Sequence, residues 1–508
     1  MSDDLPRPPR EGMIMPRTMR IHPAMATAAG INPVALLSLV LATIGALLSE
    51  NPWSSCAGLA GLVMLIKFFW TRRQPAIMFW ALLHQWLQIN AGLIYADILG
   101  EDLSAIFTYK VHSDEAYLLG MASLFALGLG IWLMTHKLSR EPLNIWLNRL
   151  DPKKCLNLYL AFIIAFSIIL KLRLPGAGQI LFALGFLKWG FFYIFFSAVL
   201  HTGRYRLLLA VCMLLEFVFS LYSYFAGFRA ILIMPLMILP VFFKGRIRFI
   251  SLLTCLLLTT LIINVGIVWT AVKMEYRRYV AQGVKGQVIN VGRNDALREL
   301  GHLVSQLDGA RYQAASIAMV QRIFYLDFLS GVIGYVPASL PHENGAITFK
   351  ALTHVVTPRI LFPEKEALHD SLHLNKYLGR FVADYQTTSM SIGYVGDLYI
   401  DFGFMAPLAV FVLGLLNGYL YRLLYRQDAS GGWGLFLAMP LFFLFYLFEI
   451  SLVKLIGMMI TYVLVMMMVA KFMLPLIKRN VERGIPARNG RTAHANPRRA
   501  LLPMGKRL

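Results

Sequence analysis

The chain has 508 residues, of which 58% are hydrophobic and only 15% are charged. A water-soluble protein of this size would have to expose many of these apolar side chains, so the composition excludes an ordinary soluble enzyme and predicts a protein embedded in lipid. The 48 Lys and Arg against 27 Asp and Glu give a net charge of +21. The distribution of this charge, described below, indicates membrane orientation rather than binding of nucleic acid.

Twelve apolar runs are candidates for transmembrane helices. A hydrocarbon core about 30 Å thick needs about 20 apolar residues of helix to cross it. The run at 229–243 is short and contains Pro235 and Pro240, so we expect it to be tilted, kinked or broken. The twelve predicted spans are 32–49, 53–70, 75–98, 116–135, 155–174, 178–200, 206–226, 229–243, 249–272, 404–424, 432–450 and 455–475. The sequence therefore predicts an all-α polytopic membrane protein with about twelve transmembrane helices.

Lys and Arg concentrate in alternate connections between these spans. Cytoplasmic connections carry an excess of these residues, so the alternation places both termini in the cytoplasm and, in a bacterium, the chain in the inner membrane. The basic residues of the connections assigned to the cytoplasm include Arg72, Arg73, Lys137, Arg149, Lys153, Lys154, Arg204, Arg206, Lys244, Arg246, Arg248, Arg422 and Arg426. The short connections assigned to the outside carry few, so the charge pattern and the twelve predicted spans agree.

One long segment, 273–390, separates the ninth and tenth predicted spans and lies on the periplasmic side in this topology. Its prolines break the second half into turns, and we expect it to cap the membrane bundle. The predicted organisation is a basic cytoplasmic tail (1–31), a bundle of about nine spans (32–272), the periplasmic loop (273–390), a bundle of about three spans (391–475) and a second basic cytoplasmic tail (476–508).

Basic residues near the predicted outer boundary are the first candidates for a binding site. Arg229 opens an otherwise uncharged span, where a helix N-terminus would help its guanidinium group to bind an anion. The alternative is an anchor that reaches the lipid head groups. Further cations of the long segment, among them Lys273 and Arg322, lie beside the outer leaflet and are either ligands for an anion or ordinary surface charge. The residues selected for binding an anion are Arg229, Arg277, Arg278, Arg359, Lys365 and Arg380.

Acidic and histidine side chains are the candidates for a general base. The entry to the tenth span reads Gly-Asp-Leu-Tyr-Ile-Asp-Phe-Gly over 396–403, and on a helix Asp397 and Asp401 share one face. They either orient or deprotonate a hydroxyl group or form salt bridges with arginines, and His354 is the third candidate. His369 and His373 have the spacing of a metal pair but lack a His-Glu-x-x-His pattern, so we expect no metal.

Polar side chains also occur inside the predicted spans. Lys188 and Glu216 lie near mid-span on neighbouring helices, which indicates either an ion pair or a site for a coupling ion. The third span is unusually polar at His84, Gln85, Gln88 and Asn90, which either line a groove or join helices by hydrogen bonds.

Together these features resemble the bacterial O-antigen and exopolysaccharide repeat-unit polymerases of the Wzy type. The similarity rests on a Gly-x-Arg motif ending at Arg229, a large outside loop, the Pro-Arg motif at Arg359 and the 396–403 motif. The family more often has Glu and Asn where this chain has Asp397 and Asp401. The resemblance implies a glycosyltransferase-C-like fold and a metal-independent enzyme without a cofactor. It would join undecaprenyl-pyrophosphate-linked oligosaccharides at the periplasmic face, with a chain-length regulator protein as a partner.

The implied chemistry gives each candidate a role. Arg229, Arg359 and Arg380 would stabilise the departing pyrophosphate, supported by Arg277, Arg278 and Lys365, while Asp397, Asp401 or His354 would deprotonate the attacking hydroxyl group. Two alternatives remain open at this stage. An O-antigen ligase would use the same chemistry with a lipid A core as acceptor. A transporter of lipid-linked oligosaccharides would instead use Lys188, Glu216 and the polar third span along its path.

Overall fold

The computed structural model describes residues 33–71, 73–138, 143–172, 176–221, 229–242, 249–284, 289–357, 362, 364–365, 368–384, 388–428 and 431–482. The chain divides into two units, Met1–Gly45 and Ala46–Leu508. Of the first unit, the described residues form most of helix α1 (Pro33–Leu47). The features below all belong to the second unit.

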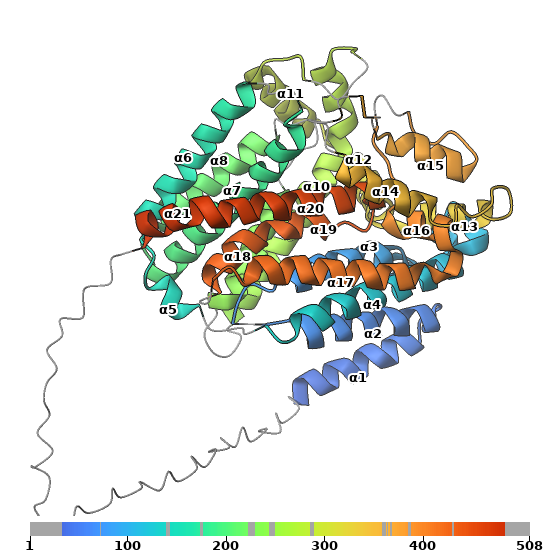
Figure 1. Cartoon of the computed structure of the whole chain (residues 1–508). Coiled ribbons are helices and arrows are strands. Elements are labelled where there is room, and N and C mark those ends of the chain that lie inside the picture. The colour runs from blue at the N-terminus through green and yellow to red at the C-terminus, as the bar shows by residue number, and fades with distance from the viewer. Residues whose placement is uncertain are drawn as a thin grey trace, which may run out of the picture. The chain divides into compact units, whose positions relative to one another are not determined.

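Helices are the regular elements of the described ranges, together with one isolated antiparallel bridge between Leu150 and Glu482 (Figure 1). The α-helices of the second unit are α2 (Pro52–Phe69), α3 (Ile77–Leu99), α4 (Ser113–Thr135), α5 (Asn144–Leu147), α6 (Pro152–Lys171), α7 (Gly178–Thr202), α8 (Arg206–Leu221), α9 (Arg229–Ile238), α10 (Phe249–Ala281), α11 (Arg293–Ser305), α12 (Gly309–Ile323), α13 (Leu326–Tyr335), α14 (Ala346–Val356), α15 (Asp370–Leu378), α16 (Tyr394–Phe402), α17 (Ala406–Tyr425), α18 (Gly432–Ala438), α19 (Phe442–Phe445), α20 (Leu452–Met468) and α21 (Leu474–Val481). Short 3-10 turns follow α9 (Leu239–Phe242), precede α17 (Gly403–Met405) and join α18 to α19 (Met439–Leu441).

Seven helical stretches of the described chain are long and apolar enough to cross a membrane. Because its regular elements are helices and so many of them are apolar, the chain is an all-α membrane protein. They are Pro52–Phe69, Lys110–Thr135, Pro152–Lys171, Gly178–Thr202, Leu256–Ala281, Tyr394–Tyr425 and Leu452–Val481. The pair α12 and α13, bent by 54°, would be an eighth as one broken span. Each of the twelve apolar runs predicted from the sequence contains a helix, and the run at 229–243 has Pro235 inside α9 and a 3-10 turn after it. The number of crossings stays a prediction.

Helices α4 and α17, far apart in the sequence, lie side by side (Figure 1). Gly414 and Gly418 are four residues apart on α17, a spacing that lets helix backbones approach closely. A Cβ atom added at Gly414 would lie 2.5 Å from the carbonyl oxygen of Leu127, and one at Gly418 would lie 2.9 Å from that of Ile131. Larger side chains cannot be accommodated here, so this contact fixes α17, and with it α16, against α4.

The polar side chains of α3 bind a non-helical connection, 446–451, and its flank. Gln85 Nε2 donates to the carbonyl oxygen of Phe445 at 2.6 Å, and Gln85 Oε1 accepts from the Tyr394 hydroxyl group at 2.8 Å. The backbone N–H of Phe448 donates to Gln88 Oε1 at 2.7 Å. Non-helical backbone in a lipid-embedded protein needs such partners because water is scarce there. Of the two alternatives that the sequence left open, Gln85 and Gln88 therefore show hydrogen bonds between elements.

The segment predicted to cap the bundle packs into it at several points. α10 continues to Ala281, and α12 packs along both α10 and α3. α13 packs on α4, and α14 lies along α20 and α16. These contacts place residues of the 273–390 segment in the wall of the central cavity described next. The side of the membrane on which this segment lies stays a prediction.

Candidate functional site

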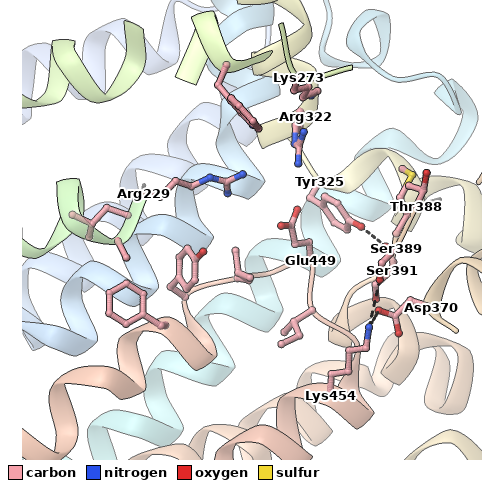
Figure 2. Close-up of a pocket in the computed structure, with 18 of the residues that line it drawn as sticks. Arg229, Lys273, Arg322, Tyr325, Asp370, Thr388, Ser389, Ser391, Glu449 and Lys454 are labelled. Atoms are coloured by element: carbon pink, nitrogen blue, oxygen red, sulfur yellow. Dashed lines mark hydrogen bonds and ion pairs between the residues drawn. The ribbon is translucent and has the colours of Figure 1, made fainter. Parts of the chain in front are cut away.

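A cavity of about 1170 Å³ opens between α7, α8, α9, α10, α12 and the connection before α20 (Figure 2). Aromatic and aliphatic side chains form much of its wall, including Phe186, Trp189, Trp269, Phe328 and Phe443. The polar and charged residues of the wall include Lys188, Glu216, Arg229, Lys273, Arg277, Arg322, Tyr325, Asp327, Asp370, Ser389, Ser391, Tyr446, Glu449 and Lys454. Tertiary packing thus brings residues from positions 186 to 454 into one space.

Two ion pairs belong to this wall. Lys188 Nζ lies 2.8 Å from Glu216 Oε2, and Glu216 Oε1 accepts a hydrogen bond from the Tyr159 hydroxyl group at 2.7 Å. Lys454 Nζ lies 2.5 Å from Asp370 Oδ2. The predicted pairing of Lys188 with Glu216 is therefore confirmed, and the pair faces the cavity. In both pairs the two charges compensate one another, so neither adds to the net charge of the cavity.

A cluster of four further cations gives the cavity an excess of positive charge. Arg229 is the first residue of α9, Lys273 and Arg277 lie one turn apart on α10, and Arg322 lies in the last turn of α12. Lys273 interacts electrostatically with all three arginines, so the four groups repel one another. Among the described residues neither Arg229 nor Arg322 forms a salt bridge with a carboxylate. Repulsion of this kind is relieved by an anion, which makes the cluster a candidate anion-binding site.

Glu449 brings a carboxylate to the same cavity. It lies in the 446–451 connection, and Figure 2 shows its carboxylate pointing into the space that Arg229 and Arg322 approach. The positive charges of Arg229 and Arg322 act on this carboxylate. The connection is held where the carbonyl oxygen of Tyr446 lies 3.1 Å from Nδ1 of His84 and where Phe448 is bound by α3.

The opposite wall of the cavity is rich in hydroxyl groups. Ser389 and Ser391 line it together with the Asp370–Lys454 pair, and Figure 2 shows them across Glu449 from Arg229. The hydroxyl group of Tyr325 donates to the carbonyl oxygen of Ser391. A cavity of this kind offers a cationic wall for an anion and a neutral, hydrogen-bonding wall for a polyhydroxylated ligand such as a sugar.

The chain was compared with models of protein families, with curated proteins and with solved structures. No family model, curated protein or solved structure matches the chain.

The site residues predicted from the sequence did not include Lys273, Arg322 and Glu449, although the sequence around Glu449 carried a usable signal. It is the single charged residue between Asp428 and Lys454, and an acid in an apolar stretch is a functional candidate. Lys273 and Arg322 have no comparable signal, because they lie in a segment with many other basic residues.

The structure places two of the six predicted anion-binding residues, Arg229 and Arg277, in the cavity wall. Arg278 is exposed on α10 and is not part of that wall. The guanidinium group of Arg380 lies over the ring of Tyr109, 4.4 Å from its centroid. These four arginines are therefore not brought together in one site.

The remaining two predicted cations lie around the end of α14. Lys365 Nζ donates to the carbonyl oxygen of Thr357 at 2.8 Å and to that of His354. Arg359 lies outside the described residues. His354, a predicted base, is in the last turn of α14 and does not line the cavity. The part that these three residues take in function stays a prediction.

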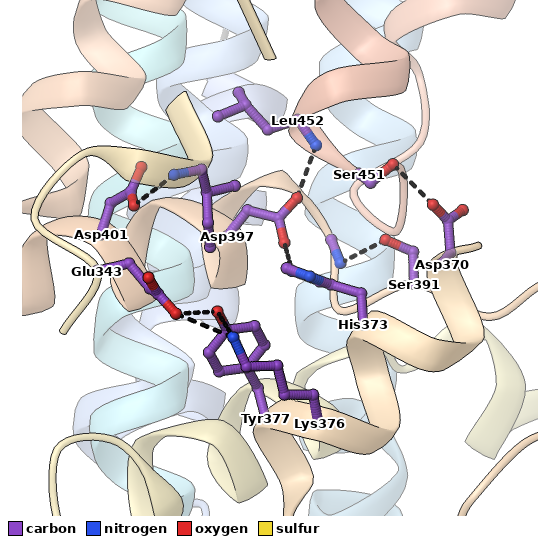
Figure 3. Close-up of polar contacts among 12 residues, drawn as sticks. Glu343, Asp370, His373, Lys376, Tyr377, Ser391, Asp397, Asp401, Ser451 and Leu452 are labelled. Carbon is purple, nitrogen blue, oxygen red and sulfur yellow. Dashed lines mark hydrogen bonds and ion pairs between the residues drawn. The ribbon is translucent and has the colours of Figure 1, made fainter. Parts of the chain in front are cut away.

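Asp397, also predicted as a base, is 1% exposed and joins three elements (Figure 3). Its Oδ1 atom lies 3.0 Å from Nε2 of His373 on α15. Its Oδ2 atom accepts from the backbone N–H of Leu452, the first residue of α20, at 2.8 Å. The carboxylate thus compensates a free N–H group at a helix start.

Asp401 has the same kind of environment at the start of α14. It is 1% exposed and accepts from the backbone N–H groups of Ile347 at 3.0 Å and Thr348 at 2.7 Å. The hydroxyl group of Thr348 adds a third hydrogen bond at 2.6 Å. Within the described residues neither Asp401 nor Asp397 pairs with an arginine, and neither lines the cavity. Both are held by the framework that surrounds it.

Proposed function

We propose that the chain is a membrane glycosyltransferase that joins polyprenyl-pyrophosphate-linked oligosaccharides, and that the cavity binds the pyrophosphate. The observation that carries this proposal is the convergence of Arg229, Lys273, Arg277 and Arg322 on one cavity of a membrane protein. Pockets for ligands of drug size are about 300–1,000 Å³. A cavity of about 1170 Å³ is large enough for a pyrophosphate with attached sugar, and its aromatic wall suits the start of a polyprenyl chain.

The chemistry follows from the charge that develops in the reaction. When the bond between the sugar C1 atom and the pyrophosphate oxygen breaks, negative charge grows on the pyrophosphate. Guanidinium groups held in a cavity of low dielectric stabilise this charge more in the transition state than in the ground state. Their paired N–H donors also match phosphate oxygens in geometry. The sugar–pyrophosphate bond itself supplies the free energy, so the transfer needs no nucleotide.

The proposed topology places this reaction outside the cytoplasm. With about twelve crossings and both termini cytoplasmic, Arg229 and the 273–390 segment lie on the periplasmic side of a bacterial inner membrane. The acceptor is then the terminal sugar of a second lipid-linked unit, as in a polysaccharide polymerase. Transfer to a lipid A core, as in a ligase, would use the same cavity. Gels of lipopolysaccharide from cells lacking the gene separate the two, because a core with one repeat unit indicates a polymerase and a bare core indicates a ligase.

Replacement of the cavity arginines tests the proposal. We expect Arg229→Lys and Arg322→Lys each to lower glycan transfer by about 100-fold, because an ammonium group cannot make the paired contacts of a guanidinium group. The measurement uses the purified full chain with lipid-linked oligosaccharides extracted from cells that lack it, and follows the glycan ladder on a gel. Arg298→Lys is the matched control, since Arg298 is 84% exposed on α11. Full activity in both cavity variants would contradict the proposed site.

Transport of a lipid-linked oligosaccharide is the second candidate function. The observation that favours it is the Lys188–Glu216 pair, which lines the same cavity between two apolar helices. A transporter moves its ligand between two compartments and makes no covalent bond. Appearance of longer glycans in detergent solution, where no compartments exist, would therefore support the enzyme and exclude transport as the sole activity.

A further inference from the structure

The cavity wall contains four carboxylates in its described part, and their surroundings differ. Glu216 is paired with Lys188, and Asp370 with Lys454. Asp327 Oδ1 accepts from the backbone N–H groups of Thr108 and Tyr109, at 2.8 and 3.2 Å. Glu449 forms neither a hydrogen bond nor a salt bridge with another described residue. A carboxylate in this state keeps its lone pairs available for a ligand.

Glu449 also lies between the two walls that a transfer reaction requires. The charges of Arg229 and Arg322 act on it from the cationic wall. Ser389, Ser391 and the Asp370–Lys454 pair are on its other side (Figure 2). A diphosphate bound by the arginines and a sugar bound by the hydroxyl-rich wall would therefore meet beside its carboxylate.

We propose that Glu449 is the catalytic base that deprotonates the acceptor sugar, an inference that rests on the proposed function. The acceptor hydroxyl group gives its proton to the Glu449 carboxylate while its oxygen forms the new bond to C1 of the donor sugar. The bond from C1 to the pyrophosphate oxygen breaks, and its electron pair stays on the pyrophosphate. The products are a lengthened glycan and free polyprenyl pyrophosphate, which takes up the proton from Glu449 directly or through water.

The surrounding structure suits Glu449 for this role. Hydrogen bonds from α3 to Phe445, Tyr446 and Phe448 hold the connection directly before Glu449. Geometry of this kind keeps a base in place while the substrate binds. The positive charges of Arg229 and Arg322 act on this carboxylate from the cationic wall.

The test separates chemistry from binding. Purified full-length Glu449→Gln, Glu449→Asp and wild-type chains are assayed for binding of undecaprenyl pyrophosphate and for transfer with lipid-linked oligosaccharides extracted from cells that lack the chain. We expect Glu449→Gln to bind within about threefold of the wild type and to lose about 100- to 10,000-fold in turnover. Glu449→Asp keeps the base and should retain part of the rate. Glu275→Gln is the matched control, because Glu275 is paired with Arg311 on an exposed face of α10.

Two results would overturn the inference in distinguishable ways. If Glu449→Gln keeps wild-type turnover while Arg322→Lys is impaired, Glu449 is not the base, and the proposed function stays intact. A wild-type chain that neither binds undecaprenyl pyrophosphate nor lengthens the glycan would overturn the function and this inference together. Retained binding in Glu449→Gln also shows that the variant is folded, so its loss of turnover reports on the reaction.

Discussion

The α16 region and the 446–451 connection both place acids among apolar residues, but they use them differently. Asp397 and Asp401 on α16 are 1% exposed and bound to N–H groups at the starts of α20 and α14. Glu449 in the connection lines the cavity and faces Arg229 and Arg322 without a hydrogen bond to a described residue. The comparison teaches that the partners of a carboxylate, more than its motif, indicate whether it supports the fold or performs chemistry.

The difference has a simple physical origin. An ionised carboxylate has about four positions for hydrogen-bond donors. Asp401 accepts three hydrogen bonds, from Thr348 and Ile347, so only about one position is left for a substrate hydroxyl group. Glu449 interacts with its arginines through charge alone, and such interactions adjust when a ligand enters. Framework acids thus hold the cavity in place, and the cavity acid remains free to exchange a proton.

The largest effect on stability is expected for Asp397→Ala. If this substitution altered only the rate of glycan transfer, Asp397 would not be the structural acid that the comparison with Glu449 makes it. The substitution leaves the buried N–H of Leu452 and the ring of His373 without their acceptor, at a cost of about 3 kcal/mol in free energy of unfolding. Thermal unfolding of the detergent-solubilised chain measures it. Asp397→Asn keeps one acceptor and should be milder, with turnover within about tenfold of the wild type. Loss of all turnover in a fully stable Asp397→Asn would make Asp397 a reacting group.

A smaller effect is expected for Gln88→Met. This substitution tests whether the 446–451 connection must be held by α3 for Glu449 to act. The buried N–H of Phe448 loses its acceptor, which costs about 1–2 kcal/mol. Because Glu449 follows directly, turnover should fall by about tenfold while binding of undecaprenyl pyrophosphate changes little. Gln313→Met, at an exposed position on α12, is the control for the substitution itself. Unchanged turnover in Gln88→Met would show that the position of Glu449 does not depend on α3.

The smallest effect is expected for a third acid, Glu343, which Figure 3 shows beside Tyr377 and Lys376 of α15. Hydrogen bonds from the Tyr377 hydroxyl group and Lys376 lower the pKa of Glu343 below its usual value. A lowered pKa means that the stabilisation is present above the pKa of the unfolded chain and is lost as pH falls through the folded one. The side chain is 33% exposed, so we expect no more than about 0.5 kcal/mol.

Thermal unfolding of the wild type and Glu343→Gln as a function of pH checks this sign. The two curves should differ at neutral pH and converge in acid, once the carboxyl group of Glu343 is protonated. A difference that grows as the pH falls would contradict the assigned partners. Because this cluster lies outside the cavity wall, glycan transfer should be equal in the two proteins at neutral pH.

The sequence was a good guide to the positions of the helices. Each apolar run contains a helix, because chain in lipid must satisfy its backbone groups internally. The depth of Lys188 and Glu216 predicted an ion pair as one of two alternatives, and the polar third span predicted either a groove or hydrogen bonds between helices. The 396–403 motif drew attention to Asp397 and Asp401 as bases, and their role in catalysis stays a prediction. Their bonds to α14 and α20 depend on contacts with segments some 50 residues away.

By itself, then, the sequence determined that the chain belongs in a membrane and where its helices lie, because both follow from transferring side chains and backbone out of water over short stretches. Only the tertiary structure decided that Arg229, Lys273, Arg277, Arg322 and Glu449 share one cavity. Their positions span more than 200 residues, and no local pattern encodes which helix faces meet. Charges far apart in sequence acquire a common role when packing brings them within electrostatic reach of each other.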